Sequence, residues 1–203
     1  GSAIALTPKS ERCETILQAW YPGQAGGTAV ADVLFGEYNP AGRLPITFYK
    51  NTEQLPDFED YSMKGRTYRY FTDAPLFPFG YGLSYTTFAY GDAHIYRADN
   101  AKNDMLLYIP VTNTGKREGE EVIQVYLRKP GDKDAPQRTL RGFKRVKLDA
   151  GQKQDVCISL TDESFEWFDT NTNTMHPVAG NYELLYGGSS RLEDLKVLPV
   201  TIK

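Results

Sequence analysis

The sequence has few of the residues on which several common chemistries depend. Only two cysteines, Cys13 and Cys157, and two histidines, His94 and His176, occur among its 203 residues. The cysteines form no Cys-x-x-Cys pair, so zinc knuckles and redox motifs are absent; we expect two buried free thiols, although one long-range disulfide also fits the count. The histidines have neither His-x-x-x-His spacing nor a Gly-x-Ser-x-Gly elbow nearby. Zinc hydrolases and serine hydrolases therefore have no motif support.

Long apolar runs and an excess of basic residues are also missing. No segment approaches the roughly 18 uninterrupted apolar residues of a membrane span. Lys plus Arg number 23 and Asp plus Glu number 26, which gives a formal net charge of −3. Phosphate binding needs a concentrated basic surface, so this balance disfavours nucleic acid as a partner. With 40% hydrophobic and 24% charged residues, the composition is that of a globular protein.

Aromatic and turn-forming residues are present in surplus. The chain contains 14 Tyr, 10 Phe and 2 Trp, together with 18 Gly and 12 Pro. In its second half, apolar and polar residues alternate, which is the period of strands with one buried face. The apolar positions are Leu107, Ile109 and Val111; Ile123, Val125 and Leu127; Val156, Ile158 and Leu160; Tyr182, Leu184 and Tyr186; and the run 197–202. Seven or so short strands over roughly 110 residues predict an immunoglobulin or fibronectin type III style β-sandwich, in which Tyr182 is either a tyrosine corner or an ordinary core tyrosine.

The residues before the predicted sandwich follow a different pattern. Residues 14–20 form a short, mostly apolar run that could be a buried strand or a helix end. A glycine turn and a helix follow, with Thr28 as the expected N-cap and Gly36 in the left-handed position past the helix end. This is the closing unit of an α/β layer. Over residues 39–85, repeated Pro and Gly predict coil, and coils of this length are commonly functional loops or linkers.

Three other patterns suggest chemistry but have simpler interpretations. The glycine-rich turn at 23–28 lacks the lysine of a phosphate-binding P-loop, so we interpret it as turn geometry. An acidic cluster in the coil could supply a general acid and a nucleophile, but neighbours in coil are not held at the spacing that a pair of carboxylates needs across a substrate bond. This cluster is Asp57, Glu59 and Asp60, and we expect it to be a solvated loop. A second acidic cluster, Glu118, Glu120 and Glu121, we expect to be surface charge.

The most unusual segment is residues 60–71, Asp-Tyr-Ser-Met-Lys-Gly-Arg-Thr-Tyr-Arg-Tyr-Phe. Aromatic rings stack on sugar faces and charged groups bond hydroxyls, so the segment suits a sugar-facing loop. Alternatively, the rings anchor the coil to a neighbouring domain, since one buried aromatic side chain removes about 150–250 Å² from water. Both interpretations can hold for different residues. The candidate substrate-loop residues are Tyr61, Arg66, Tyr68, Arg69 and Tyr70.

Several further motifs occur in a fixed order along nearly the whole chain. They are Ala19-Trp-Tyr-Pro-Gly-Gln24, Gly26-Gly27, Ala31-Asp-Val-Leu-Phe-Gly36, Asn39-Pro-Ala-Gly-Arg-Leu-Pro45, Phe77-Pro-Phe-Gly-Tyr-Gly-Leu-Ser-Tyr85, Thr139-Leu-Arg-Gly-Phe-Lys-Arg-Val146 and Ala179-Gly-Asn-Tyr-Glu-Leu184. Together they resemble the C-terminal portion of glycoside hydrolase family 3, which contains β-glucosidases and β-xylosidases. The last two motifs are similar to the fibronectin type III-like domain of that family.

The resemblance implies a mainly β fold in three parts. Residues 1–48 would close an α/β sandwich domain, residues 49–85 would form a linker, and residues 86–203 would form a fibronectin type III-like β-sandwich. It also implies that the chain is the C-terminal fragment of a retaining β-glycosidase, which removes terminal β-linked glucose or xylose from oligosaccharides. A periplasmic or secreted location follows from the same resemblance.

The resemblance also implies that the catalytic residues lie elsewhere. Family members use an aspartate nucleophile on an N-terminal barrel and a glutamate acid/base in the following α/β domain, and both motifs would lie upstream of Gly1. No residue here matches either motif, so we assign no catalytic residue, no metal ligand and no cofactor. The expected partners are the upstream domains of the same polypeptide and, at the aromatic loop, an oligosaccharide. The alternative is a non-catalytic carbohydrate-binding or adhesion module, which explains the aromatic loop but not the strand–turn–helix segment before it.

Overall fold

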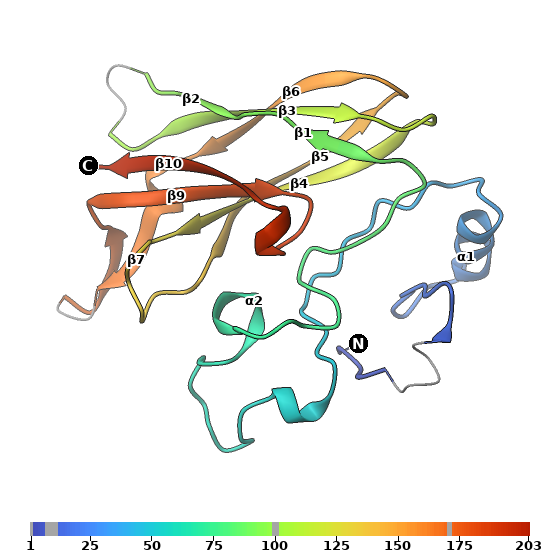
Figure 1. Ribbon diagram of the computed structural model, residues 1–203, viewed down its shortest axis with the longest axis horizontal. Coiled ribbons are helices and arrows are strands. Elements are labelled where there is room, and N and C mark those ends of the chain that lie inside the picture. The colour runs from blue at the N-terminus through green and yellow to red at the C-terminus, as the bar shows by residue number, and fades with distance from the viewer. Residues whose placement is uncertain (1, 7–11, 99–101, 170–171) are drawn as a thin grey trace.

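The structure is a computed structural model that describes residues 2–6, 12–98, 102–169 and 172–203. Two antiparallel sheets lie face to face in the C-terminal part of the chain, and the N-terminal segments extend along one side and one end of them (Figure 1). The helical elements are short: α1 (Gly26–Leu34), η2 (Thr52–Gln54), α2 (Thr67–Tyr70), η3 (Asp162–Phe165) and η4 (Leu192–Asp194). Of the helices in the described ranges, none has the length and apolar character needed to cross a membrane.

The strands form two four-stranded sheets and one separate hairpin. In the first sheet, β1 and β2 pair with opposite ends of β3, and β6 also pairs with β3. The second sheet has the order β10-β9-β4-β5. The strands are β1 (Phe88–Tyr90), β2 (His94–Tyr96), β3 (Met105–Asn113), β4 (Gly119–Arg128), β5 (Thr139–Leu148), β6 (Lys153–Leu160), β7 (Glu166–Asp169), β8 (Thr174–Pro177), β9 (Gly180–Gly187) and β10 (Lys196–Ile202). The predicted sandwich is confirmed.

The main core lies between the two sheets, and the alternating residues of the sequence fill it. All the alternating positions predicted on β3, β4, β6 and β9 are buried, as are Val200 and Ile202 at the end of β10. The hydroxyl of Tyr182 donates a hydrogen bond to the Val178 carbonyl oxygen at 2.8 Å. This bond to the backbone a few residues upstream is the geometry of a tyrosine corner, so that alternative is confirmed.

Strand β4 is buried on both of its faces. Val125 and Leu127 point into the core, and Tyr126, which points the other way, is 0% exposed. The pairing of β4 with β5 shifts between Val125 and Tyr126, where Arg141 is the extra residue of a bulge. An outward tyrosine without solvent exposure means that another part of the chain covers this face of the second sheet.

Helix α1 does not begin where the sequence predicts, but it ends as predicted. It begins at Gly26 with Ala25 as the N-cap, so Thr28 lies inside the helix and caps nothing. A Cβ at Gly26 would lie 2.4 Å from the Pro22 Cβ, so the chain can turn into the helix here only at a glycine. Gly36 follows the helix with φ of +83°, which confirms its predicted left-handed conformation.

The apolar run at 14–20 is neither a buried strand nor a helix end, contrary to both sequence expectations. All of its residues are exposed and without regular structure. A strand forms when a neighbouring strand satisfies its backbone groups, and no strand in the described ranges lies beside this run. Cys13 is exposed and Cys157 is half-buried; both thiols are free, as expected, but the prediction of burial was wrong.

Candidate functional site

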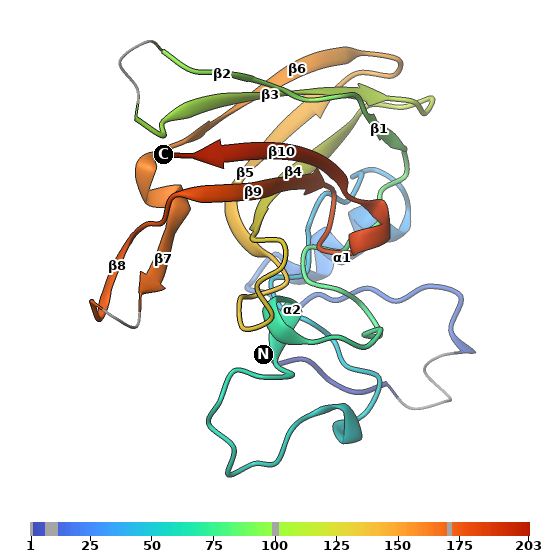
Figure 2. The same ribbon diagram turned by 60° about the vertical axis from the view of Figure 1, so that its left-hand side comes forward.

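The connecting coil (residues 39–85) covers the outer face of the second sheet. Helix α2, within this coil, lies beneath the sandwich in both Figure 1 and Figure 2. Tyr126, Leu185 and Leu195 of the sandwich form a second apolar cluster, and Tyr68 and Phe79 of the coil pack against it. The coil is therefore attached to the sandwich by a small core of its own.

Tyr68 is the centre of this attachment. Its ring stacks on Phe79 with the centroids 4.4 Å apart and meets Tyr126 edge-on at 5.7 Å. Its hydroxyl oxygen accepts a hydrogen bond from the Leu140 backbone N–H of β5 at 3.1 Å. Burial, together with the neighbouring Tyr68, raises the pKa of the Tyr126 hydroxyl. Of the five candidate substrate-loop residues, Tyr68 therefore has the contacts of a docking residue.

Backbone groups after Tyr68 extend the contact to the segment before β5. The Arg69 carbonyl oxygen accepts from the Gln137 N–H at 2.7 Å, and the Gln137 side-chain amide donates to the Phe71 carbonyl oxygen at 3.1 Å. The Arg69 guanidinium lies over the Tyr70 ring, 5.5 Å from its centroid. The Phe71 ring is buried and meets Tyr49 of the same coil edge-on.

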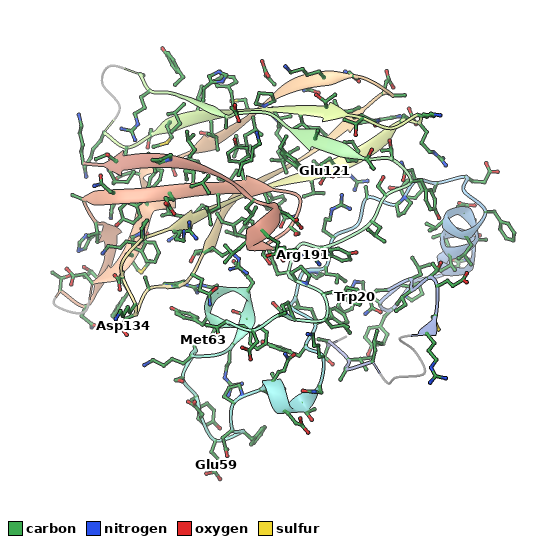
Figure 3. All side chains as sticks on the ribbon, in the orientation of Figure 1. Trp20, Glu59, Met63, Glu121, Asp134 and Arg191 are labelled. Carbon is green, nitrogen blue, oxygen red and sulfur yellow. The ribbon has the colours of Figure 1, made fainter. Side chains whose placement is uncertain are left out.

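The other end of the aromatic segment lies away from the sandwich. Tyr61 is 91% exposed, and its ring stacks on no other aromatic ring within the described residues. Arg66 closes the loop on itself, because its guanidinium donates to the carbonyl oxygens of Asp60, at 2.5 Å, and Ser62, at 3.1 Å. The Ser62 backbone N–H bonds the Asp60 carboxylate and holds its pKa below the usual range. Figure 3 shows Glu59 at the end of the coil farthest from the sheets, and the acidic cluster is a solvated loop as expected.

A buried ion pair forms a second attachment point. One guanidinium nitrogen of Arg43 donates to both carboxylate oxygens of Glu121, each at 3.1 Å, and both side chains are less than 10% exposed. Burial raises the pKa of the Glu121 carboxyl, and the Arg43 charge opposes that rise. Glu121 was expected to be surface charge, and this is corrected: its carboxylate faces the coil that crosses β4 (Figure 3).

A buried glutamine joins three segments next to this ion pair. The Gln124 amide nitrogen donates to the carbonyl oxygens of Gly80, at 3.1 Å, and Gly188, at 2.6 Å. The Tyr126 hydroxyl donates to the Gln124 side-chain oxygen. A Cβ at Gly80 would lie 1.9 Å from that oxygen, so only glycine permits the coil to approach β4 so closely.

Sequence reasoning missed Arg43, Gln124 and Glu121 as attachment residues. A signal existed in β4, where Gln124 and Tyr126 alternate with core residues but stand in a nearly continuous apolar run. A strand buried on both faces has this composition. The partner of Glu121 could not be inferred, because Arg43 is distant in sequence and lies in coil.

The comparisons with known proteins fit this arrangement and define its class. Residues 1–85 match the family described as glycosyl hydrolase family 3 C-terminal domain, and residues 121–190 match the fibronectin type III-like domain. The order of the two matches is that of the coil and the sandwich. The chain is thus a C-terminal region of the kind found in multidomain glycoside hydrolases.

The relatives agree on one family. The chain is 60% identical over its whole length to a xylan 1,4-β-xylosidase of Xylanibacter ruminicola and 38% identical over 83% of its length to a periplasmic β-glucosidase of Salmonella typhimurium. A solved β-glucosidase structure from Streptomyces venezuelae superposes with a TM-score of 0.80 at 32% identity over 91% of the chain. The chain spans only 23%, 24% and 26% of these proteins, respectively. It belongs to glycoside hydrolase family 3, of which it holds the C-terminal region.

Proposed function

We propose that this chain is the structural C-terminal region of a retaining β-glycosidase that removes terminal β-linked glucose or xylose from oligosaccharides. The docked coil is the observation that carries the proposal. The buried Arg43–Glu121 pair and the Tyr68 cluster fix the coil on the sandwich, which is what a bracing role requires. The catalytic carboxylates belong to other parts of the whole protein, which is consistent with the fraction of each relative that the chain spans.

The proposed partners are upstream domains of the same polypeptide. Large apolar side chains are exposed in the N-terminal segments, where a monomeric surface would normally be polar. They are Ile16, Leu17, Trp20, Tyr21, Leu34, Phe35, Leu55 and Phe58. In this proposal, residues 1–48 close an α/β domain, 49–85 link it to the sandwich of 86–203, and the apolar side chains become buried against the domain that they complete. A periplasmic or secreted location is part of the same proposal, and one relative is named as periplasmic.

A hydrolysis assay tests whether catalysis requires parts of the whole protein outside this chain. The 203-residue chain and a longer protein that contains it are each incubated with aryl β-xyloside and aryl β-glucoside. We expect the longer protein to hydrolyse at least one of them and the chain alone to hydrolyse neither. Contaminant-free turnover by the chain alone would contradict the proposal.

A carbohydrate-binding module is the second candidate, because Tyr61 and Phe58 present exposed rings on one loop. Calorimetric titration of the chain with xylo- and gluco-oligosaccharides separates the two candidates. Saturable binding that is lost on Tyr61→Ala, while Tyr85→Ala at another exposed ring leaves it intact, would favour the binding module. The structural proposal predicts no saturable heat from these neutral sugars.

A further inference from the structure

A cavity of about 310 Å³ lies between the connecting coil and the sandwich. Its size is at the lower end of the range for small-molecule sites. Its lining residues include Phe71, Asp73 and Pro78 of the coil and Arg138, Arg191 and Glu193 of the sandwich. Figure 3 shows Arg191 on the side of the sandwich that faces the coil. The coil and the sandwich therefore build the cavity together.

Arg138 brings a buried positive charge to this cavity. The residue is only 7% exposed, yet its guanidinium has no ion-pair partner within the described residues. Its one side-chain hydrogen bond goes to the Gln137 amide oxygen at 3.3 Å, and its Nε has no partner there. Burial lowers the pKa of Arg138. A guanidinium stays charged in proteins, so an unpaired one in this position is costly unless an anion joins it.

More unused hydrogen-bonding capacity lies beside Arg138. An adjoining cavity of about 20 Å³ shares Phe71, Pro75, Pro78, Asp73 and Arg138 with the larger one. Thr47 and Ser190 also line the smaller cavity; both are more than 90% buried, and neither hydroxyl has a partner among the described residues. The volume suits a single water molecule, which these hydroxyls would hold. Polar side chains therefore line the inner end of the cavity, and the larger part of it remains for a ligand.

The outer part of the cavity combines apolar walls with exposed charges. Leu192 and the coil residues Phe71, Pro75 and Pro78 supply apolar surface. Arg191 is only loosely paired, at 3.8 Å from Glu193 and 3.7 Å from Asp194. Asp73 and Glu193 add carboxylates that can accept hydrogen bonds from hydroxyl groups. Positively charged, hydrogen-bond-accepting and apolar side chains therefore meet in one cavity.

We propose that this cavity binds a sugar acid, a monosaccharide unit that carries a carboxylate. The carboxylate pairs with the Arg138 guanidinium, for which planar carboxylates are the matched partner. The hydroxyl groups donate to Asp73 and Glu193, and the C–H face of the ring lies on the apolar walls. This site goes beyond the proposed function, which gives the chain no ligand of its own. None of the five candidate substrate-loop residues lines the larger cavity, and Tyr68 alone lines the smaller one.

Calorimetric titration of the 203-residue chain tests the proposal with three probes: D-glucuronate, D-glucose and acetate. D-Glucose is the same ring without the carboxylate, and acetate is the carboxylate without the ring. A charge-assisted hydrogen bond is worth roughly tenfold in affinity or more, so we expect saturable D-glucuronate binding at least about tenfold tighter than that of either other probe. Equal affinity for D-glucose would overturn the anion site, equal affinity for acetate would overturn the sugar recognition, and no saturable D-glucuronate binding would overturn both.

Variants locate the binding in the cavity. Arg138→Gln removes the charge with little change in size, and we expect D-glucuronate affinity to fall at least about tenfold. Arg145→Gln is the matched control, because Arg145 is exposed and pairs with Glu120 away from the cavity. If Arg138→Gln fails to fold, Arg191→Gln at the exposed rim is expected to lower the affinity several-fold. Unchanged affinity in a folded Arg138→Gln protein, or in Arg191→Gln when Arg138→Gln does not fold, would contradict the proposal.

Discussion

At the scale of single residues, Arg43 and Glu121 decide how firmly the coil is held. Burying either charge alone would cost free energy, but the two side chains neutralise each other and form two hydrogen bonds. The Val122 backbone N–H adds a third bond to the Glu121 carboxylate at 2.9 Å. Because both charges are almost fully withdrawn from water, the loss of one partner should cost far more than the loss of a surface ion pair.

Substitution of Arg43 is the first test at this scale. We expect Arg43→Met to lower the free energy of unfolding by about 3–5 kcal/mol, because it leaves a buried carboxylate unpaired. Combining it with Glu121→Gln should restore part of the loss. Arg145→Met is the control, since its exposed pair with Glu120 should contribute at most about 1 kcal/mol. Urea unfolding measures all of these variants, and equal effects of the two arginine substitutions would be the opposing result.

Tyr68 and Tyr61 provide a matched pair of tyrosines from one segment. Tyr68→Ala should cost at least about 2 kcal/mol of unfolding free energy, because it empties the cluster with Phe79 and Tyr126. Tyr68→Phe keeps the ring and should cost about 1 kcal/mol for the lost bond from Leu140. Tyr61→Ala should change stability by less than about 0.5 kcal/mol. Denaturant unfolding measures the three variants. An equal loss of unfolding free energy in Tyr61→Ala and Tyr68→Ala would contradict the packing difference between the two tyrosines.

At the scale of elements, the strands could be predicted from the sequence because alternation reports burial directly. Residues such as Ile109 and Val125 point into the core as their period requires. The bulge at Arg141 and the burial of Tyr126 under the coil could not be predicted, because both depend on contacts between segments distant in sequence. The same limit explains the error at residues 14–20: an apolar run indicates burial against something, but not whether that partner is present. For the candidate loop, the residue types indicated docking or sugar contact, and only tertiary packing could distinguish Tyr68 from Tyr61.

The hairpin of β7 and β8 places the His176 ring beside the Asp169 carboxylate. The two ring nitrogens of His176 lie 3.1 Å from the Pro177 carbonyl oxygen and 3.2 Å from the Asp169 carboxylate. These acceptors, with the charge of Glu166, raise the pKa of His176 above 6.5. A raised histidine pKa stabilises the folded form fully below pH 6.5, and this contribution is lost as the pH rises through the raised value.

NMR titration of the His176 ring measures this shift. We expect a pKa above 6.5 in the chain and a lower value in Asp169→Asn, because the substitution removes the negative charge beside the ring. A His176 pKa that does not change in Asp169→Asn would contradict the assigned role of that carboxylate.

Hydrogen exchange compares the elements directly. In the 203-residue chain, we expect the amides of β3 and β4 to be the most protected and those of residues 14–20 to exchange fastest, since the run has no regular structure and is exposed. The coil around α2 should be intermediate, because its bonds to Gln137 and Leu140 tie it to β5. Strong protection throughout residues 14–20 would contradict this order.

At the scale of the whole molecule, the chain is a complete sandwich with a coil bound to its outer face and apolar segments beyond it. The family relationship and the fraction of the relatives that the chain spans connect this architecture with β-glycosidases. Nothing in the docked coil requires contact between Tyr68 and a substrate, because packing accounts for its ring and its hydroxyl. In the proposed function, the coil and the sandwich therefore contribute stability, and other parts of the whole protein select the substrate.

Tyr68→Ala in a longer, active protein that contains this chain tests that assignment most directly. The thermal unfolding midpoint and the ratio of kcat/KM for aryl β-xyloside to that for aryl β-glucoside are measured with and without the substitution, below the lower midpoint. We expect a lower midpoint and an unchanged ratio. A changed ratio with an unchanged midpoint would show that this residue selects the substrate and does not brace the fold.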